Sequence, residues 1–157
     1  MMEIEQKLNH LWGKVGFIVN LSQMVEYNLA NILAFDEILR EFEKVDSMFV
    51  FEYNEFAKKA NDWYAKLSKN TFGYGLKRAK EIHFFTKESE LLLSQTVTKR
   101  NYVIHQLFKD DLISKHLETD PDYYYNELEE TIELLYTVNN SLVEIFKKQK
   151  MEYKLIW

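Results

Sequence analysis

The sequence predicts an all-α protein, an up-down bundle of four to five helices that begins with a long first helix. Two observations carry this prediction. Only four glycines and one proline occur among 157 residues, so few positions interrupt a helix. Apolar residues also recur at three-, four- and seven-residue steps, the period of a helix with one buried face. No repeat or linker divides the chain, so we expect a single domain over residues 1–157.

The first helix is predicted from about Glu3 to Glu43. Gly13 and Gly16 lie inside it, where each costs about 1 kcal/mol relative to alanine, so they indicate a bend or a close helix contact. An apolar residue returns every seven positions, at Ile4, Leu11, Ile18, Val25, Ile32 and Leu39. Surplus apolar residues are expected to pack on other helices or on a second subunit; these are Trp12, Phe17, Val19, Leu33 and Phe35.

Three shorter helices are predicted next, over residues 54–68, 72–82 and 88–109. The apolar segment 47–53, before the first of them, must be covered by other parts of the protein. Gly73-Tyr74-Gly75 suggests a phosphate-cradling loop, but no strand precedes it and no Lys-Ser/Thr follows it. Close packing between helices is the better explanation for these glycines.

The last helix begins at Asp120-Pro121, a capping acid followed by a proline in the first turn, and runs to about Gln149. A turn or short helix is expected over residues 112–117. The tail, residues 151–157, ends in three large apolar side chains and is therefore expected to dock on the body or on a partner chain.

Composition and charge limit the function classes. The chain is 46% apolar, which indicates a packed core, and it has no cysteine, which excludes disulfides and thiolate zinc sites. The first residues are acidic and no apolar run approaches the ~20 residues of a membrane span, so we expect a cytoplasmic protein that does not enter a membrane. The net charge of −5 argues against an extended nucleic-acid surface, although it leaves room for a local phosphate site.

One stretch interrupts the packing pattern. With the helix of residues 88–109 phased on Leu93, Val97, Ile104 and Phe108, Arg100 falls inside the apolar sector. A guanidinium keeps its charge, so in that position it needs a partner, an anion or water. A polar stripe follows the flank of the same sector, at Ser94, Thr98, Asn101 and His105.

This stretch carries the groups needed for phosphoryl chemistry. A neutral His105 can take a proton from a hydroxyl and return it to a leaving oxygen, while Arg100 can hold a phosphate and its developing charge. Asn101, with Thr98 beside it, can orient the imidazole or bind substrate. Arg100 and His105 lie ~140° apart around the helix and ~7.5 Å apart along it, so convergence is easier across two subunits. A structural Arg100 with a capping His105 explains the same pattern.

Other chemistry lacks support. No histidine has a glutamate three residues before it, and no two histidines are four apart, so we predict no metal site. No nucleophile-elbow pattern is present. His10, His83 and His116 occupy ordinary amphipathic positions and are expected to be solvated or satisfied in the core.

The segment Arg100-Asn101-Tyr102-Val103-Ile104-His105 resembles the Arg-x4–6-His motif, often Arg-Asn-x3-His, of the HEPN superfamily (higher eukaryotes and prokaryotes nucleotide-binding domains). The resemblance implies a HEPN-like bundle that forms a homodimer, with the motifs of two subunits lining one cleft. It implies a metal-independent ribonuclease without cofactors, of the kind found in toxin–antitoxin and antiviral-defence systems. It assigns catalytic roles to Arg100 and His105 and a supporting role to Asn101.

One position departs from a toxin branch of this superfamily. That branch has His-x-Tyr, with a tyrosine that a partner antitoxin nucleotidylates, whereas this chain has Leu107 there. The resemblance also covers proteins without nuclease activity. The alternative is therefore a non-catalytic helical interaction protein or a nucleotide-binding protein, in which Arg100 and His105 are structural.

Overall fold

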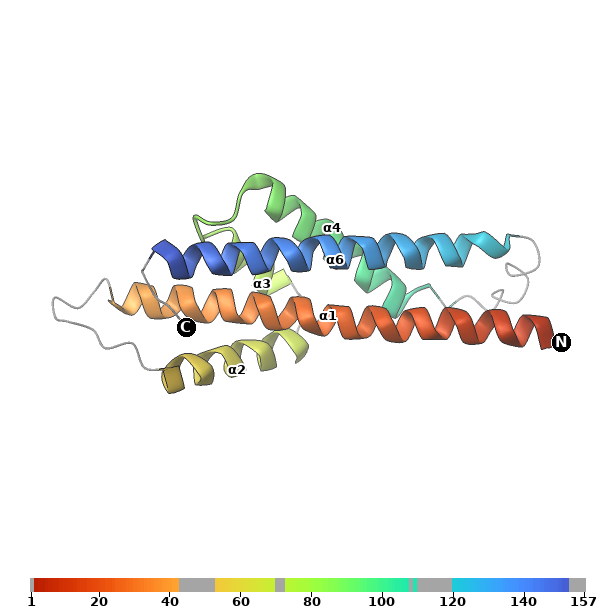
Figure 1. The fold of residues 1–157 in the computed structure, drawn as a ribbon, viewed down its shortest axis with the longest axis horizontal. Coiled ribbons are helices and arrows are strands. Elements are labelled where there is room, and N and C mark those ends of the chain that lie inside the picture. The colour runs from red at the N-terminus through yellow and green to blue at the C-terminus, as the bar shows by residue number, and fades with distance from the viewer. Residues whose placement is uncertain (1, 43–52, 70–72, 108, 110–119, 153–157) are drawn as a thin grey trace.

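The structure, a computed structural model, describes residues 2–42, 53–69, 73–107, 109 and 120–152 (Figure 1). Within these ranges it is all-helical and contains no strand, which confirms the predicted fold class and the long first helix. The helices are α1 (Met2–Phe42), α2 (Tyr53–Lys69), α3 (Gly73–Ala79), α4 (Lys87–His105) and α6 (Pro121–Glu152).

The long helices α1 and α6 lie side by side over most of their length, and both run in the same direction (Figure 1). Their contacts advance together along the two sequences: His10 stacks on Tyr125, and the side chain of Gln149 donates to the carbonyl of Ile32 at 3.3 Å. Helices α2 and α4 run the opposite way. The chain therefore returns through α2, α3 and α4 before α6 closes the bundle.

The seven-residue pattern of α1 marks its buried face, as predicted. Five of its six positions are buried, and the first one, Ile4, is half-buried; the buried five are Leu11, Ile18, Val25, Ile32 and Leu39. These side chains meet buried residues of α6, among them Leu128, Leu135 and Leu142, in one continuous core.

Helix α2 covers only the C-terminal part of α1, so the two halves of α1 have different surroundings (Figure 1). Residues 29–35 are all buried, and they include the predicted packing residues Leu33 and Phe35. In the N-terminal half, Trp12, Phe17 and Val19 keep 50%, 41% and 39% of their surface exposed. Among the described residues, the surplus apolar side chains are fully buried where α2 lies against α1, whereas Phe17 meets the ring of Tyr136 on α6 and stays partly exposed.

Gly75 lies in a close helix contact, as predicted for the Gly73-Tyr74-Gly75 segment. A Cβ atom at Gly75 would lie 2.6 Å from Cδ2 of Leu67 and 3.2 Å from Cδ2 of Leu29. The missing side chain lets α3 approach α2 and α1. Gly13 and Gly16 differ, because a Cβ atom at either would meet nothing within 4 Å.

Alanine at Gly13 or Gly16 is expected to raise the free energy of unfolding by about 0.5–1 kcal/mol, because alanine costs less backbone entropy in a helix and meets no neighbour here. Urea denaturation at low protein concentration measures this gain. The control is Gly75→Ala, which has the same helix-propensity gain but crowds Leu67 and Leu29. A loss of stability at both Gly13 and Gly16 would contradict this account of the open surface.

Some predicted boundaries shift. The helix predicted over residues 72–82 ends at Ala79, and the one predicted to reach Lys109 ends at His105. The cause at the second end is local: the carbonyl of Tyr102 accepts hydrogen bonds from the amides of both Gln106 and Leu107, at 2.9 Å each, which closes the helix. The predictions for residues 47–52, 112–117 and 153–157 lie outside the described residues. No helix in the described part of the chain is long and apolar enough to span a membrane.

Candidate functional site

Helix α4 carries the predicted site residues, and its first turn is held by a capping box. The side chain of Thr86 accepts from the backbone amide of Ser89 at 3.1 Å, and the side chain of Ser89 accepts from the amide of Thr86 at 2.9 Å. The helix then buries Leu93 and Val97. Arg100 lies one turn further along the same face of α4, so its side chain points toward α1.

Arg100 occupies the apolar sector and finds its partner on α1. Its Nη2 lies 3.4 Å from Oε1 of Glu26, and its Nη1 donates to Oδ1 of Asn101 at 2.9 Å. The Arg100 side chain is 22% exposed, and that of Glu26 only 4%. We call Glu26, Arg100 and Asn101 the arginine cluster. Glu26 and Asn101 together hold the guanidinium in one orientation.

Burial raises the pKa of the Glu26 carboxyl above its usual value, and the charge of Arg100 opposes this shift without cancelling it. The sequence interpretation did not single out Glu26. A signal was present, because Glu26 is the only charged residue between Lys14 and Asp36. A lone charge in so apolar a stretch needs a partner from another helix.

His105 is the last residue of α4, and its side chain is exposed. Thr98 is exposed as well, and its hydroxyl donates to the carbonyl of Ser94 at 3.0 Å. Within the described residues no hydrogen bond joins His105 to Arg100 or to Asn101. The structure thus brings Arg100 and Asn101 together with Glu26, whereas His105 and Thr98 lie along the neighbouring polar stripe.

This arrangement provides two functions on one helix. The arginine cluster supplies a fixed positive charge at the edge of the core, where charges are less screened than in bulk water. His105 supplies an imidazole that solvent can reach. Within one chain the two residues lie ~140° apart around α4, so they could act on one molecule only if it bridged them or if a second surface completed the site.

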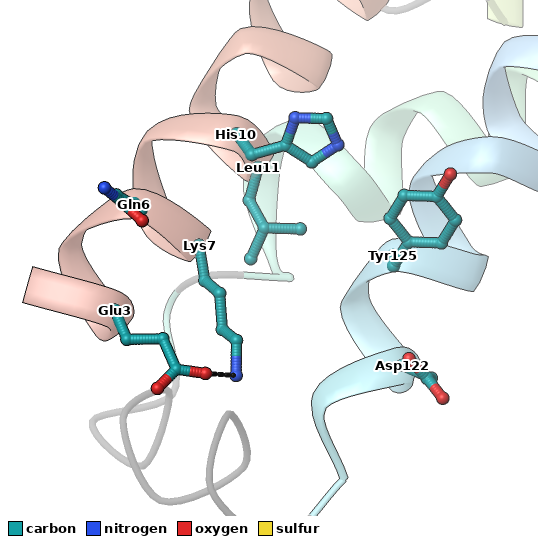
Figure 2. Close-up of a pocket in the computed structure, with 7 residues that line it drawn as sticks. All are labelled: Glu3, Gln6, Lys7, His10, Leu11, Asp122 and Tyr125. Atoms are coloured by element: carbon teal, nitrogen blue, oxygen red, sulfur yellow. Dashed lines mark ion pairs between the residues drawn. The ribbon is translucent and has the colours of Figure 1, made fainter.

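A separate cavity of about 380 Å³ lies between the N-terminal ends of α1 and α6 (Figure 2). His10 stacks on Tyr125 beside it, with ring centroids 6.1 Å apart, and Lys7 pairs with Glu3 at 3.3 Å. Apart from the buried Leu11, its lining side chains are exposed. Its histidine is therefore solvated, as expected for His10; His83 is likewise exposed, 3.5 Å from Glu152. His116 lies outside the described residues.

Within the described ranges, no three histidine, aspartate or glutamate side chains are grouped so that they would hold a metal ion. Comparison of the chain with known protein families, with curated proteins and with solved structures found no match.

Proposed function

We propose that the protein is a HEPN-like, metal-independent endoribonuclease of the toxin or antiviral-defence type, acting through Arg100 and His105 at a cleft between two copies. The observation that best supports this proposal is the arginine cluster. It holds a permanent cation, 22% exposed, five residues before an exposed imidazole on the same helix. These are the two groups that cleavage of RNA by its own 2′-hydroxyl requires.

In this reaction the neutral imidazole of His105 removes the proton of a ribose 2′-hydroxyl. The 2′-oxygen attacks the adjacent phosphorus, and the bond from phosphorus to the 5′-oxygen of the next nucleotide breaks. An imidazolium returns a proton to that 5′-oxygen. Arg100 stabilises the negative charge that builds on the non-bridging oxygens, and Asn101 helps to hold its guanidinium. The products are a 2′,3′-cyclic phosphate and a 5′-hydroxyl.

A second copy is part of the proposal because His105 and Arg100 lie ~140° apart around α4 in one chain. The imidazole of one copy and the guanidinium of the other would then act on one phosphate. The net charge of −5 restricts RNA contact to this local site. In a cytoplasmic toxin–antitoxin pair, an antitoxin would act by covering the polar stripe that includes Thr98 and His105.

The test uses purified protein with structured and unstructured RNA in the presence of a chelator. His105→Ala is expected to lower the cleavage rate by about 100-fold or more without changing the melting temperature, because the side chain is exposed. Arg100→Lys keeps the charge but loses the planar fork, so it should also lower the rate. The matched control is His83→Ala, another exposed histidine. Cleavage that survives both site substitutions would remove the assignment.

A second candidate is a non-catalytic helical protein that binds a partner or a nucleotide. The ion pair with Glu26 favours it, since the pair alone explains an arginine in the apolar sector. A wild-type protein that cleaves none of these RNAs, but loses stability when Arg100 is replaced by alanine, would support this candidate over the ribonuclease.

A further inference from the structure

A second cavity, of about 570 Å³, lies between the middle of α1 and the C-terminal half of α2, which pack side by side (Figure 1). Four side-chain amides line it, those of Asn20, Gln23, Asn28 and Asn61. The other lining residues are Met24, Tyr27 and Tyr64. We call this site the amide cavity. Its volume is within the range of small-molecule sites, about 300–1,000 Å³.

The packing of α2 on α1 forms this cavity. Ala60 and Trp63 of α2 are buried, and Asn61 and Tyr64 each come one residue later, about 100° further around the helix. They therefore lie at the edge of the contact with α1. The ring of Tyr64 meets that of Tyr27 there, with centroids 6.2 Å apart and an angle of 74° between the ring planes. This ring pair joins the two walls of the amide cavity.

The seven lining residues include no charged side chain, although 29% of the chain is charged. The nearest charges on α1 pair with other helices, since Lys14 meets Glu129 of α6 and Glu26 meets Arg100 of α4. A phosphate, carboxylate or ammonium group would find no opposite charge in this lining and would lose part of its hydration. The part of a ligand that enters the amide cavity is therefore uncharged.

The four amides favour a ligand with donors and acceptors side by side. Each amide offers two N–H donors and a carbonyl acceptor, so it can bond an adjacent acceptor and donor at once, as Asn and Gln do with the edge of adenine. One amide is already oriented, because Nδ2 of Asn28 donates to Oδ1 of Asn139 on α6 at 2.7 Å. Asn20, Gln23 and Asn61 are exposed, so their amides can turn toward a ligand.

The remaining lining residues favour a flat aromatic ligand. In an edge-to-face ring pair each ring covers at most one face of the other, and Tyr27 keeps 55% of its surface exposed. Nucleobases stack on such ring faces. The thioether of Met24 also makes favourable contacts with aromatic rings. A saturated sugar ring would gain less from these three side chains.

We propose that the amide cavity binds an unpaired nucleobase, which stacks on a tyrosine ring and hydrogen-bonds the amides, with any phosphate outside. A free nucleoside and an unpaired base in a single strand share this chemistry. At 100° per residue, Glu26 lies about 120° from Asn20 around α1, so the amide cavity is separate from the arginine cluster. The inference therefore does not rest on the proposed ribonuclease function.

The test titrates the full chain with adenosine, guanosine, cytidine and uridine and follows the side-chain amide signals by NMR. At least one nucleoside should saturate and shift the signals of Asn20 and Asn61, and glucose should not displace it. A single-stranded DNA oligonucleotide carries bases but lacks the 2′-hydroxyl that the proposed cleavage needs. Tighter binding of the oligonucleotide than of the nucleoside indicates a base within a strand, whereas equal or weaker binding indicates a free nucleoside.

Variants assign the binding to the amide cavity. Asn61→Leu keeps the size of the side chain but removes its hydrogen-bonding groups, so it should weaken binding about 10-fold or more. Tyr27→Leu should weaken binding to a similar extent because stacking is lost, whereas Tyr27→Phe should bind as the wild type does. The matched control is Gln6→Leu, which replaces an exposed amide in the other cavity on α1. Helix content should be unchanged, since Asn61 and Tyr27 are exposed.

Failure of every nucleoside and of the oligonucleotide to bind saturably would overturn the proposal. So would binding that Asn61→Leu and Tyr27→Leu weaken no more than Gln6→Leu does, or displacement of the nucleoside by glucose. If bases bind and RNA is not cleaved, the ribonuclease proposal fails and this inference stands. If RNA is cleaved and neither nucleosides nor the oligonucleotide bind, this inference fails and the ribonuclease proposal stands.

Discussion

Replacement of Arg100 by alanine is expected to lower the free energy of unfolding by about 3 kcal/mol near neutral pH, because it leaves the Glu26 carboxylate without its cation. The Glu26 side chain is only 4% exposed, and its oxygen lies 3.4 Å from Nη2 of Arg100. Removal of one partner of a buried pair costs about 3–5 kcal/mol. We expect the lower end, since the 22% exposure of Arg100 lets water reach that edge of the pair.

The loss should depend on pH. Burial already raises the pKa of Glu26 above its usual 4.5, and Arg100 is the group that opposes the shift, so in Arg100→Ala the pKa rises further. The folded state then binds more protons than the unfolded state between the usual and the raised pKa. Stability therefore falls as pH rises through that window and returns as pH falls toward 4.5.

Urea denaturation across this pH range measures the effect, with two comparisons. Addition of Glu26→Gln to Arg100→Ala should recover part of the lost stability at neutral pH and remove the pH dependence due to Glu26. Arg40→Ala is the control, because its partner Asp36 also lies 4.0 Å from Arg78 and therefore keeps a cation when Arg40 is removed, so a smaller loss is expected. An Arg100→Ala variant no less stable than Arg40→Ala would contradict the account of the arginine cluster.

Trp63→Ala is expected to lower the free energy of unfolding by about 3–5 kcal/mol, the usual cost of deleting a buried aromatic side chain. Trp63 is 2% exposed on α2, and its ring stacks on Tyr74 of α3 with centroids 5.5 Å apart. The cavity left behind would loosen α2 and α3 together. The midpoint of urea unfolding, followed by circular dichroism, measures the loss.

Trp12→Ala is the matched comparison for that variant. Trp12 is 50% exposed in the half of α1 that α2 does not reach, so its replacement should cost about 1 kcal/mol or less. Equal losses for the two tryptophans would show that the chain buries them to a similar extent, contrary to the structure.

Much of the fold followed from periodicity. Leu11, Ile18, Val25, Ile32 and Leu39 were identified as core positions because a seven-residue apolar repeat leaves one face of a helix to bury. Periodicity does not state which stretch of that helix a neighbour covers. It therefore could not separate the buried Leu33 and Phe35 from the exposed Trp12 and Phe17, a distinction set by where α2 lies. Nor does it give helix direction, and the parallel course of α1 and α6 came only from the structure.

The site could be predicted only within one helix. Helical phase alone placed Arg100 in the apolar sector, but its partner Glu26 lies 74 residues away in sequence, and local patterns carry no information on such a pair. The end of α4 at His105 was also not predicted, because it depends on two amides that share the carbonyl of Tyr102.

The most direct test of the central claim, that His105 and Arg100 drive attack by the 2′-hydroxyl of RNA, is the analysis of product ends. An RNA cleaved by the wild-type protein in the presence of a chelator should yield 2′,3′-cyclic phosphate and 5′-hydroxyl ends. A single 2′-deoxy nucleotide at the cleavage position should block the cut. Products with 3′-hydroxyl and 5′-phosphate ends, or unchanged cleavage of the 2′-deoxy substrate, would contradict the claim.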